Sequence, residues 1–304
     1  MRGRIVMSQH DAGITADAST RPASPNGPEG TTTCSACGVA NRGTSAQHAS
    51  EFVYAIGRIE PRFPRQSVEK EYAQVVARSE TKGLTDRQAR HKILSQPENR
   101  YLARLMCWIF TVEGLETYLL APRDPTDLNL LVESLRADPS TTDVDVVIGA
   151  TGPIASPDAC NGLELPIVIF DQIYSFDVDA LLQSIPKPKE MGSEIFKRAS
   201  AELLEKVMQL ADNNGSADRH RAINYLTVRY PVIYAKVADA IAKNCSLRSV
   251  DTVPSRLSGA RKIVDVIFSF VDRGTDVTEK CFVRIDVSDE FPFLVTKLSQ
   301  YYDR

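Results

Sequence analysis

The folded part of this chain opens with Phe52-Val-Tyr-Ala-Ile-Gly-Arg-Ile59, in which apolar side chains recur at alternate positions. This spacing, with Pro61 and Pro64 following, predicts a β-strand. Further strands are predicted where β-branched and aromatic residues cluster between turn residues. They cover residues 107–111, 116–120, 144–148, 165–170, 262–270, 281–287 and 293–298.

Between these strands, apolar residues recur with helical spacing. The predicted helices cover residues 68–80, 86–96, 125–136, 177–185, 195–211, 218–230 and 232–243. Thr85 is a suitable N-cap for the second of them. Because helices and strands come in blocks without strict alternation, we predict an α+β fold with a mixed or antiparallel sheet and packed helices.

The two ends of the chain differ in composition. Residues 1–50 are rich in Gly, Ser, Thr, Ala, Asn and Pro, with few side chains to bury. Such a segment cannot offset the entropy of ordering, so we predict a disordered tail. Residues 51–304 form the foldable part, and the stiff segment Pro186-Lys-Pro-Lys-Glu190 predicts a subdivision near residues 186–192.

Composition excludes several classes of function. The chain has 304 residues, 43% of them hydrophobic and 25% charged, as expected of a globular protein with a real core. A net charge of −3 provides no global field to attract nucleic acid or an anionic membrane. No apolar run reaches the ~18–20 residues that span a bilayer, and no signal peptide is recognisable. We therefore expect a cytoplasmic protein.

Six cysteines are present. The cytosol keeps thiols reduced, so metal ligation or simple burial is expected for them rather than a disulfide framework. Cys34 and Cys37 have the CxxC spacing of a zinc knuckle. The best candidates for the remaining ligands are Cys107 and Cys160, the latter in a turn-like stretch. The alternative is a CxxC that binds nothing.

The sequence contains no recognisable catalytic motif, and its four histidines form no local pair with a nucleophile. His91 and His220 lie on predicted helices, where a solvated side chain is the expected role. Charged clusters occur at residues 58–62, at residues 256–262 and at Asp171. Each could bind a peptide or a carboxylate, and structural salt bridges explain them equally well.

Several long strings resemble the C-terminal domain of unknown function of the cyanobactin maturation proteins PatG and PatA. They are Phe52-Val-Tyr-Ala-Ile-Gly-Arg-Ile-Glu-Pro-Arg-Phe-Pro64, Gly114-Leu-Glu-Thr-Tyr118, Pro122-Arg-Asp-Pro125, Cys160-Asn-Gly162, Phe170-Asp-Gln-Ile-Tyr-Ser-Phe176, Pro254-Ser-Arg-Leu-Ser-Gly259 and Asp289-Glu-Phe-Pro-Phe-Leu-Val-Thr-Lys297. The resemblance spans residues 50 to 304 together with the CxxC.

This resemblance implies a role in the maturation of ribosomally made cyclic peptides, without the protease activity of other domains in those proteins. It also strengthens the expectation of a structural zinc ion held by Cys34, Cys37, Cys107 and Cys160, which would leave no open coordination position. We expect a non-catalytic accessory or scaffold domain that could form a homodimer and bind other maturation proteins. The alternatives are a module that recognises the precursor peptide through an exposed strand edge, and an enzyme with a site assembled by the fold.

Overall fold

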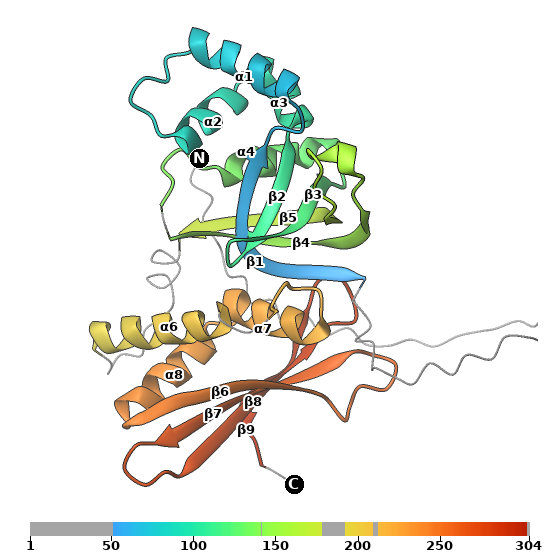
Figure 1. Cartoon of the computed structure of the whole chain (residues 1–304). Coiled ribbons are helices and arrows are strands. Elements are labelled where there is room, and N and C mark those ends of the chain that lie inside the picture. Colours follow the sequence, from blue (N-terminus) through green and yellow to red (C-terminus); the bar gives the residue numbers. More distant parts are fainter. Residues whose placement is uncertain (1–50, 141, 178–191, 209–211, 303–304) are drawn as a thin grey trace, which may run out of the picture. The chain divides into compact units, whose positions relative to one another are not determined.

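The computed structural model describes residues 51–140, 142–177, 192–208 and 212–302. These residues form two sheets with packed helices, one sheet closed into a barrel and the other open (Figure 1). The predicted α+β class with mixed and antiparallel sheets is confirmed. The predicted tail of residues 1–50, the body of the helix predicted at 177–185 and the connection at 186–190 lie outside the described residues.

Five strands close the barrel in the order β1-β2-β3-β5-β4. Neighbours are antiparallel except for β3 and β5, which are parallel. The strands are Phe52–Arg62 (β1), Cys107–Val112 (β2), Leu115–Pro122 (β3), Asp143–Ile154 (β4) and Pro166–Asp177 (β5). Because the barrel is closed, none of these five strands presents an open edge to another chain.

β1 is buried on both faces, which explains its nearly continuous apolar sequence. Val53 and Ala55 pack in the main core cluster of the barrel, whereas Tyr54 belongs to a second cluster. Gly57 of β1 lies close to Phe110 and Thr111 of β2. A Cβ atom there would be 2.2 Å from the carbonyl oxygen of Thr111, so a side chain at this position would push the two strands apart.

Four helices belong to the first half of the described chain, namely Gln66–Arg78 (α1), Asp86–Leu94 (α2), Arg100–Leu105 (α3) and Leu128–Ser134 (α4). Short 3₁₀ turns occupy Pro97–Asn99, Pro125–Asp127 and Pro157–Ala159. α2 begins with a capping box, as the N-cap prediction requires: the amide of Gln88 donates to Thr85 Oγ1 and the amide of Thr85 donates to Gln88 Oε1. Leu94, Leu102 and Leu131 join the barrel core.

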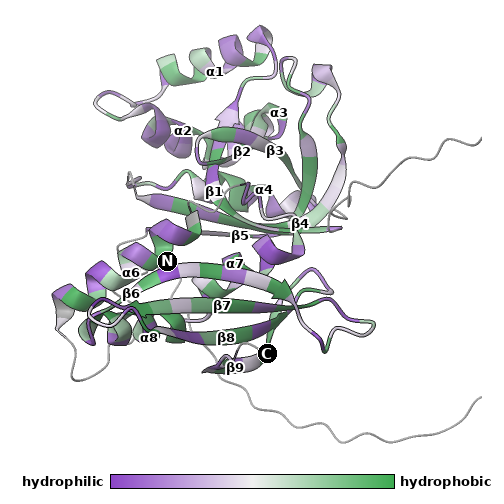
Figure 2. Ribbon diagram, turned by 60° about the horizontal axis from the view of Figure 1, so that its bottom comes forward, coloured by the Kyte–Doolittle hydropathy of each residue, from purple (hydrophilic) through white to green (hydrophobic). Residues whose placement is uncertain are grey.

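The open sheet is antiparallel, in the order β6-β7-β8-β9. Its strands are Cys245–Pro254 (β6), Ile263–Asp272 (β7), Thr278–Asp286 (β8) and Phe293–Gln300 (β9). The helices Ser193–Met208 (α6), Asp218–Arg229 (α7) and Val232–Ala242 (α8) lie on one of its faces (Figure 1). β7 is apolar along most of its length (Figure 2). The sequence predicted these elements except β6, and it also missed α3.

α7 is buried on two sides, so it links the open sheet to the barrel. Ala222 and Leu226 pack in the core of the open sheet. On the other side, Asn224 Nδ2 donates a 2.8 Å hydrogen bond to the carbonyl oxygen of Tyr54 in β1. Just before α7, the carbonyl oxygen of Gly215 accepts a 3.0 Å hydrogen bond from the amide of Tyr54. None of the helices in the described part of the chain is long and apolar enough to cross a membrane.

Candidate functional site

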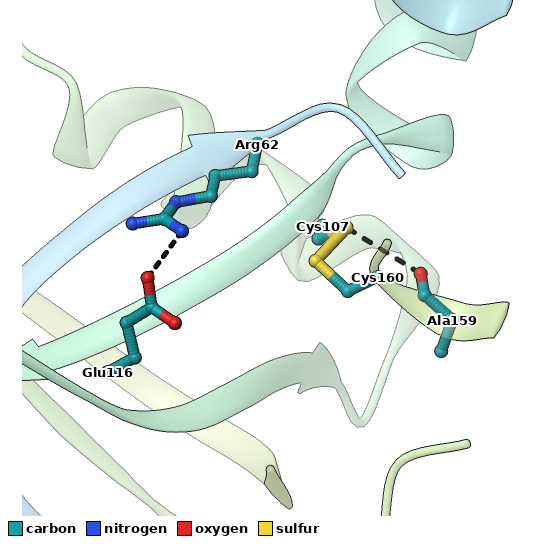
Figure 3. Close-up of a disulfide and its surroundings, with 5 residues drawn as sticks. All are labelled: Arg62, Cys107, Glu116, Ala159 and Cys160. Atoms are coloured by element: carbon teal, nitrogen blue, oxygen red, sulfur yellow. Dashed lines mark hydrogen bonds and ion pairs between the residues drawn. A yellow bond between two sulfur atoms is a disulfide. The ribbon is translucent and has the colours of Figure 1, made fainter. Parts of the chain in front are cut away.

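The fold brings Cys107 and Cys160 together, although they are 53 positions apart in the sequence. Cys107 opens β2, and Cys160 follows the 3₁₀ turn Pro157–Ala159 (Figure 3). Their sulfur atoms form a disulfide, and the two residues are only 4% and 1% exposed. The expectation of reduced cysteines is therefore wrong for this pair in this structure. Cys160 is deeply buried although it lies in a turn-like stretch.

The structure thus describes only two of the four predicted zinc ligands, Cys107 and Cys160. Cys34 and Cys37 lie outside the described residues. Among the residues that are described, no cluster of three or more His, Cys, Asp or Glu side chains could hold a metal ion. Cys281 is buried, and this burial raises the pKa of its thiol to about 11, so the thiol is protonated and unreactive at neutral pH.

The cluster at residues 58–62 has a structural role. Arg62 of β1 forms an ion pair with Glu116 of β3 (Figure 3). Both side chains are partly exposed, as is usual for an ion pair on a sheet surface. Arg62 in this cluster therefore has an acidic partner within the barrel and needs no ligand.

His220 does not have the solvated position expected of it. It is 5% exposed on α7, and its Nε2 atom accepts a 3.1 Å hydrogen bond from Nε of Arg219. Burial, reinforced by the charge of Arg219, lowers the pKa of His220 to about 4. The imidazole is therefore neutral at pH 7 and serves as an acceptor that positions Arg219. A general base with this pKa would be weak at neutral pH.

A groove of about 530 Å³ opens beside Arg219. Its walls come from the start of α7, the end of β6 and the loop between β6 and β7. The lining residues are Ala217, Asp218, Arg219, Thr252, Val253, Pro254, Ser258, Arg261, Lys262, Ile263 and Val264. The groove, which we call the β6 groove, thus includes part of the charged stretch at 256–262 that the sequence singled out. Arg219 was missed, because nothing local marks a helical arginine as part of a site.

Most charges around the β6 groove already have partners. Lys262 Nζ lies 3.9 Å from Asp218 Oδ2. Arg261 pairs with the buried Asp286, and its guanidinium lies 5.0 Å from the ring centre of Phe293. Arg219 is the exception: within the described part of the chain, its hydrogen bond to neutral His220 is its only recorded polar contact. The groove therefore offers one exposed guanidinium without an acidic partner.

The β6 groove also borders an open strand edge. β6 and β9 are the outer strands of the open sheet. The amide of Leu298 on β9 donates a 3.1 Å hydrogen bond to the hydroxyl of Tyr230. The backbone of Leu294, on the same strand, is hydrogen-bonded to the hydroxyl of Tyr225. These contacts cover part of the β9 edge. β6 pairs only with β7 among the described strands, and its last residues form a wall of the groove.

Comparisons with known proteins agree with the resemblance seen in the sequence. Residues 190–301 match the family model for the PatG C-terminal region. A solved structure titled "PatG Domain of Unknown Function" matches with a TM-score of 0.66 and 20% sequence identity, covering 83% of this chain and 99% of that one. No curated protein matches the chain. The predicted resemblance is therefore confirmed: residues 190–301 match the PatG C-terminal family model, and the chain has the fold of the PatG domain of unknown function.

Proposed function

We propose that this chain is a non-catalytic accessory domain in the maturation of ribosomal cyclic peptides, and that it binds a precursor peptide along the β6 groove. The family match supports the context. The observation that carries the binding proposal is an open strand edge that borders a groove with both apolar and charged walls. Strand addition uses main-chain hydrogen bonds for affinity and side-chain pockets for specificity.

The dimensions of the groove fit a short segment of peptide. A volume of about 530 Å³ lies within the usual range for small-ligand sites, so only a few residues can enter it. Val253, Pro254 and Ile263 supply apolar contacts. Pro254 has no amide hydrogen and ends β6, so an added strand would pair with the residues before it.

Calorimetric titration of the chain with leader and core segments of a precursor peptide tests this proposal. We expect a dissociation constant of ~100 μM or tighter for one of the segments, because even a weak specific complex reaches this range. Thr252→Pro should abolish binding, since proline removes an edge amide. Thr252→Val, which keeps the backbone amide at the same position, is the control. Absence of binding by every segment would contradict the proposal.

We further propose a structural zinc ion held by Cys34, Cys37, Cys107 and Cys160. The adjacency of the Cys107 and Cys160 sulfur atoms supports it, because these two residues would form one side of a tetrahedral site. Reduction of the disulfide by two electrons would release two thiols, which lose their protons when zinc binds. A cytoplasmic location, which we also propose, would favour this reduced form.

Elemental analysis of protein purified under reducing conditions tests the zinc proposal. We expect about one zinc ion per chain and a lower thermal midpoint after chelation. The variant Cys34→Ser should lose the metal, whereas Cys245→Ser, which removes a free cysteine elsewhere, should retain it. A folded, metal-free protein with an intact disulfide under these conditions would overturn the proposal.

We also propose that the chain forms a homodimer. The face of the open sheet that α6–α8 leave uncovered carries the exposed apolar side chains of Phe293 and Val295 on β9. A second copy could cover this face. Analytical ultracentrifugation should then give twice the chain mass, and Phe293→Ser should shift the equilibrium toward the monomer.

A further inference from the structure

Arg219 is prepared for an anionic partner. It is exposed on the surface of α7, yet its Nε atom is fixed by the hydrogen bond to His220. The imidazole is neutral at pH 7, so it orients the guanidinium without neutralising it. Both Nη groups keep their donors in the planar geometry that matches a carboxylate.

The neighbouring acidic groups do not satisfy this cation. Asp218 lies 3.8 Å from Arg221 and 3.9 Å from Lys262. Asp286 is paired with Arg261. The groove lining contains three cations (Arg219, Arg261 and Lys262) and one carboxylate, that of Asp218, so its charge is positive although the whole chain is negative. An anionic ligand is therefore attracted to this groove more strongly than to the rest of the protein surface.

We propose that the β6 groove recognises an acidic peptide, with one carboxylate of the peptide bound by Arg219 and the adjacent backbone paired with β6. This inference rests on the proposed peptide-binding function and adds the chemical class of the ligand. Lys262 contributes positive charge at the same groove. The apolar walls formed by Val253 and Ile263 favour uncharged, β-branched residues on either side of the acid.

A pair of synthetic peptides tests the inference on the full chain. Both are ten-residue peptides rich in Val and Thr with acetylated and amidated ends, and one carries a central Glu where the other carries Gln. Fluorescence anisotropy should show that the Glu peptide binds about tenfold more tightly, because a charge-assisted hydrogen bond is lost in the Gln peptide. This preference should weaken as salt is raised from 50 to 500 mM (~14 to ~4 Å Debye length).

Two arginine variants separate the site from the rest of the surface. Arg219→Gln should remove the preference for the Glu peptide, whereas Arg248→Gln, on the same strand as the groove but outside its lining, should leave the preference unchanged. Unchanged circular dichroism and thermal midpoints would show that both variants are folded. A third peptide, with Gln and a free C-terminal carboxylate, distinguishes a side-chain acid from a chain end as the bound group.

The outcomes are distinct. Equal binding of the Glu and Gln peptides would overturn the carboxylate inference and leave peptide binding intact. A preference that survives Arg219→Gln would overturn the assignment to this groove. If no peptide binds, including precursor segments, the proposed function fails together with the inference. If only the third peptide binds more tightly than the Gln peptide, the bound group is a peptide C-terminus, and the inference of an internal acidic residue is overturned.

Discussion

The carboxyl groups of Asp171 on β5 and Glu290 in the turn between β8 and β9 face each other across Arg123. Arg123 lies between them, with Nη2 2.8 Å from Asp171 and 3.6 Å from Glu290. Burial, followed by the contact with Asp171, raises the pKa of Glu290 to about 7. Two neighbouring carboxyl groups repel each other less when one of them keeps its proton. Arg123 therefore joins the barrel to the open sheet through these two carboxyl groups, and Glu290 loses its proton near neutral pH.

We predict that this proton makes stability depend on pH. The folded pKa of Glu290 lies above its ordinary value of 4.5, so its stabilising contribution is complete below pH 4.5 and is lost as pH rises through about 7. Urea unfolding at pH 5 and pH 8 should show a smaller decline for Glu290→Gln than for the natural protein. Glu279→Gln, at an exposed ion pair, is the control. A decline of equal size in Glu290→Gln would contradict the raised pKa of Glu290.

His220 should show the opposite dependence. Its folded pKa of about 4 lies below its ordinary value of 6.5, so its contribution is complete above pH 6.5 and is lost as pH falls toward 4. NMR titration of the imidazole should show no protonation of His220 between pH 7 and pH 5.5. Arg219→Gln removes the neighbouring charge and should raise the midpoint, although burial still holds it below 6.5. Titration of His220 near 6.5 in the natural protein would show that the side chain is solvated.

Arg221 should be a major determinant of stability. It is completely buried, and it donates to the carbonyl oxygens of Val287 (2.6 Å), Asp289 and Glu290 (3.2 Å). Arg221→Met would leave these carbonyl groups without their donor, and we expect a loss of about 3 kcal/mol in the free energy of unfolding. Arg219→Met, at the adjacent exposed position, should cost less than about 0.5 kcal/mol. Equal losses in both variants would show that the buried contacts add little.

Local patterns predicted most of the elements, and the exceptions have physical causes. The capping residue Thr85 and the apolar run of β7 are strong signals, and both predictions are correct. β6 was missed because its sequence, CSLRSVDTVP, places polar and charged side chains on an exposed edge strand with a bulge. An edge strand needs only one apolar face, and in β6 Leu247 is the one buried side chain. Periodicity therefore gave little indication of the strand that borders the groove.

The site was harder to predict than the fold, because its contacts are distant in sequence. The sequence predicted Cys107 and Cys160 as ligands of one zinc ion and argued against disulfides, whereas the structure joins them in a disulfide. His220 was expected in solvent because a histidine on a helix is usually solvated. The helix is nevertheless buried between β1 and the open sheet, where Asn224 and Arg221 bond to backbone carbonyl groups. In the sequence, a polar residue whose side chain bonds to buried backbone groups cannot be told from a polar residue in solvent.

Gly215 should be irreplaceable where α7 meets β1. It has a positive φ of 77°, and a Cβ atom there would lie 2.5 Å from the carbonyl oxygen of Tyr54. Gly215→Ala therefore combines backbone strain with a clash against β1, and we expect a loss of at least about 2 kcal/mol in urea unfolding. Gly83→Ala isolates the first effect, because Gly83 also has a positive φ (85°) but has open space around it. That control should cost about 1 kcal/mol. If the two variants lose the same free energy, the contact with β1 is looser than the structure describes.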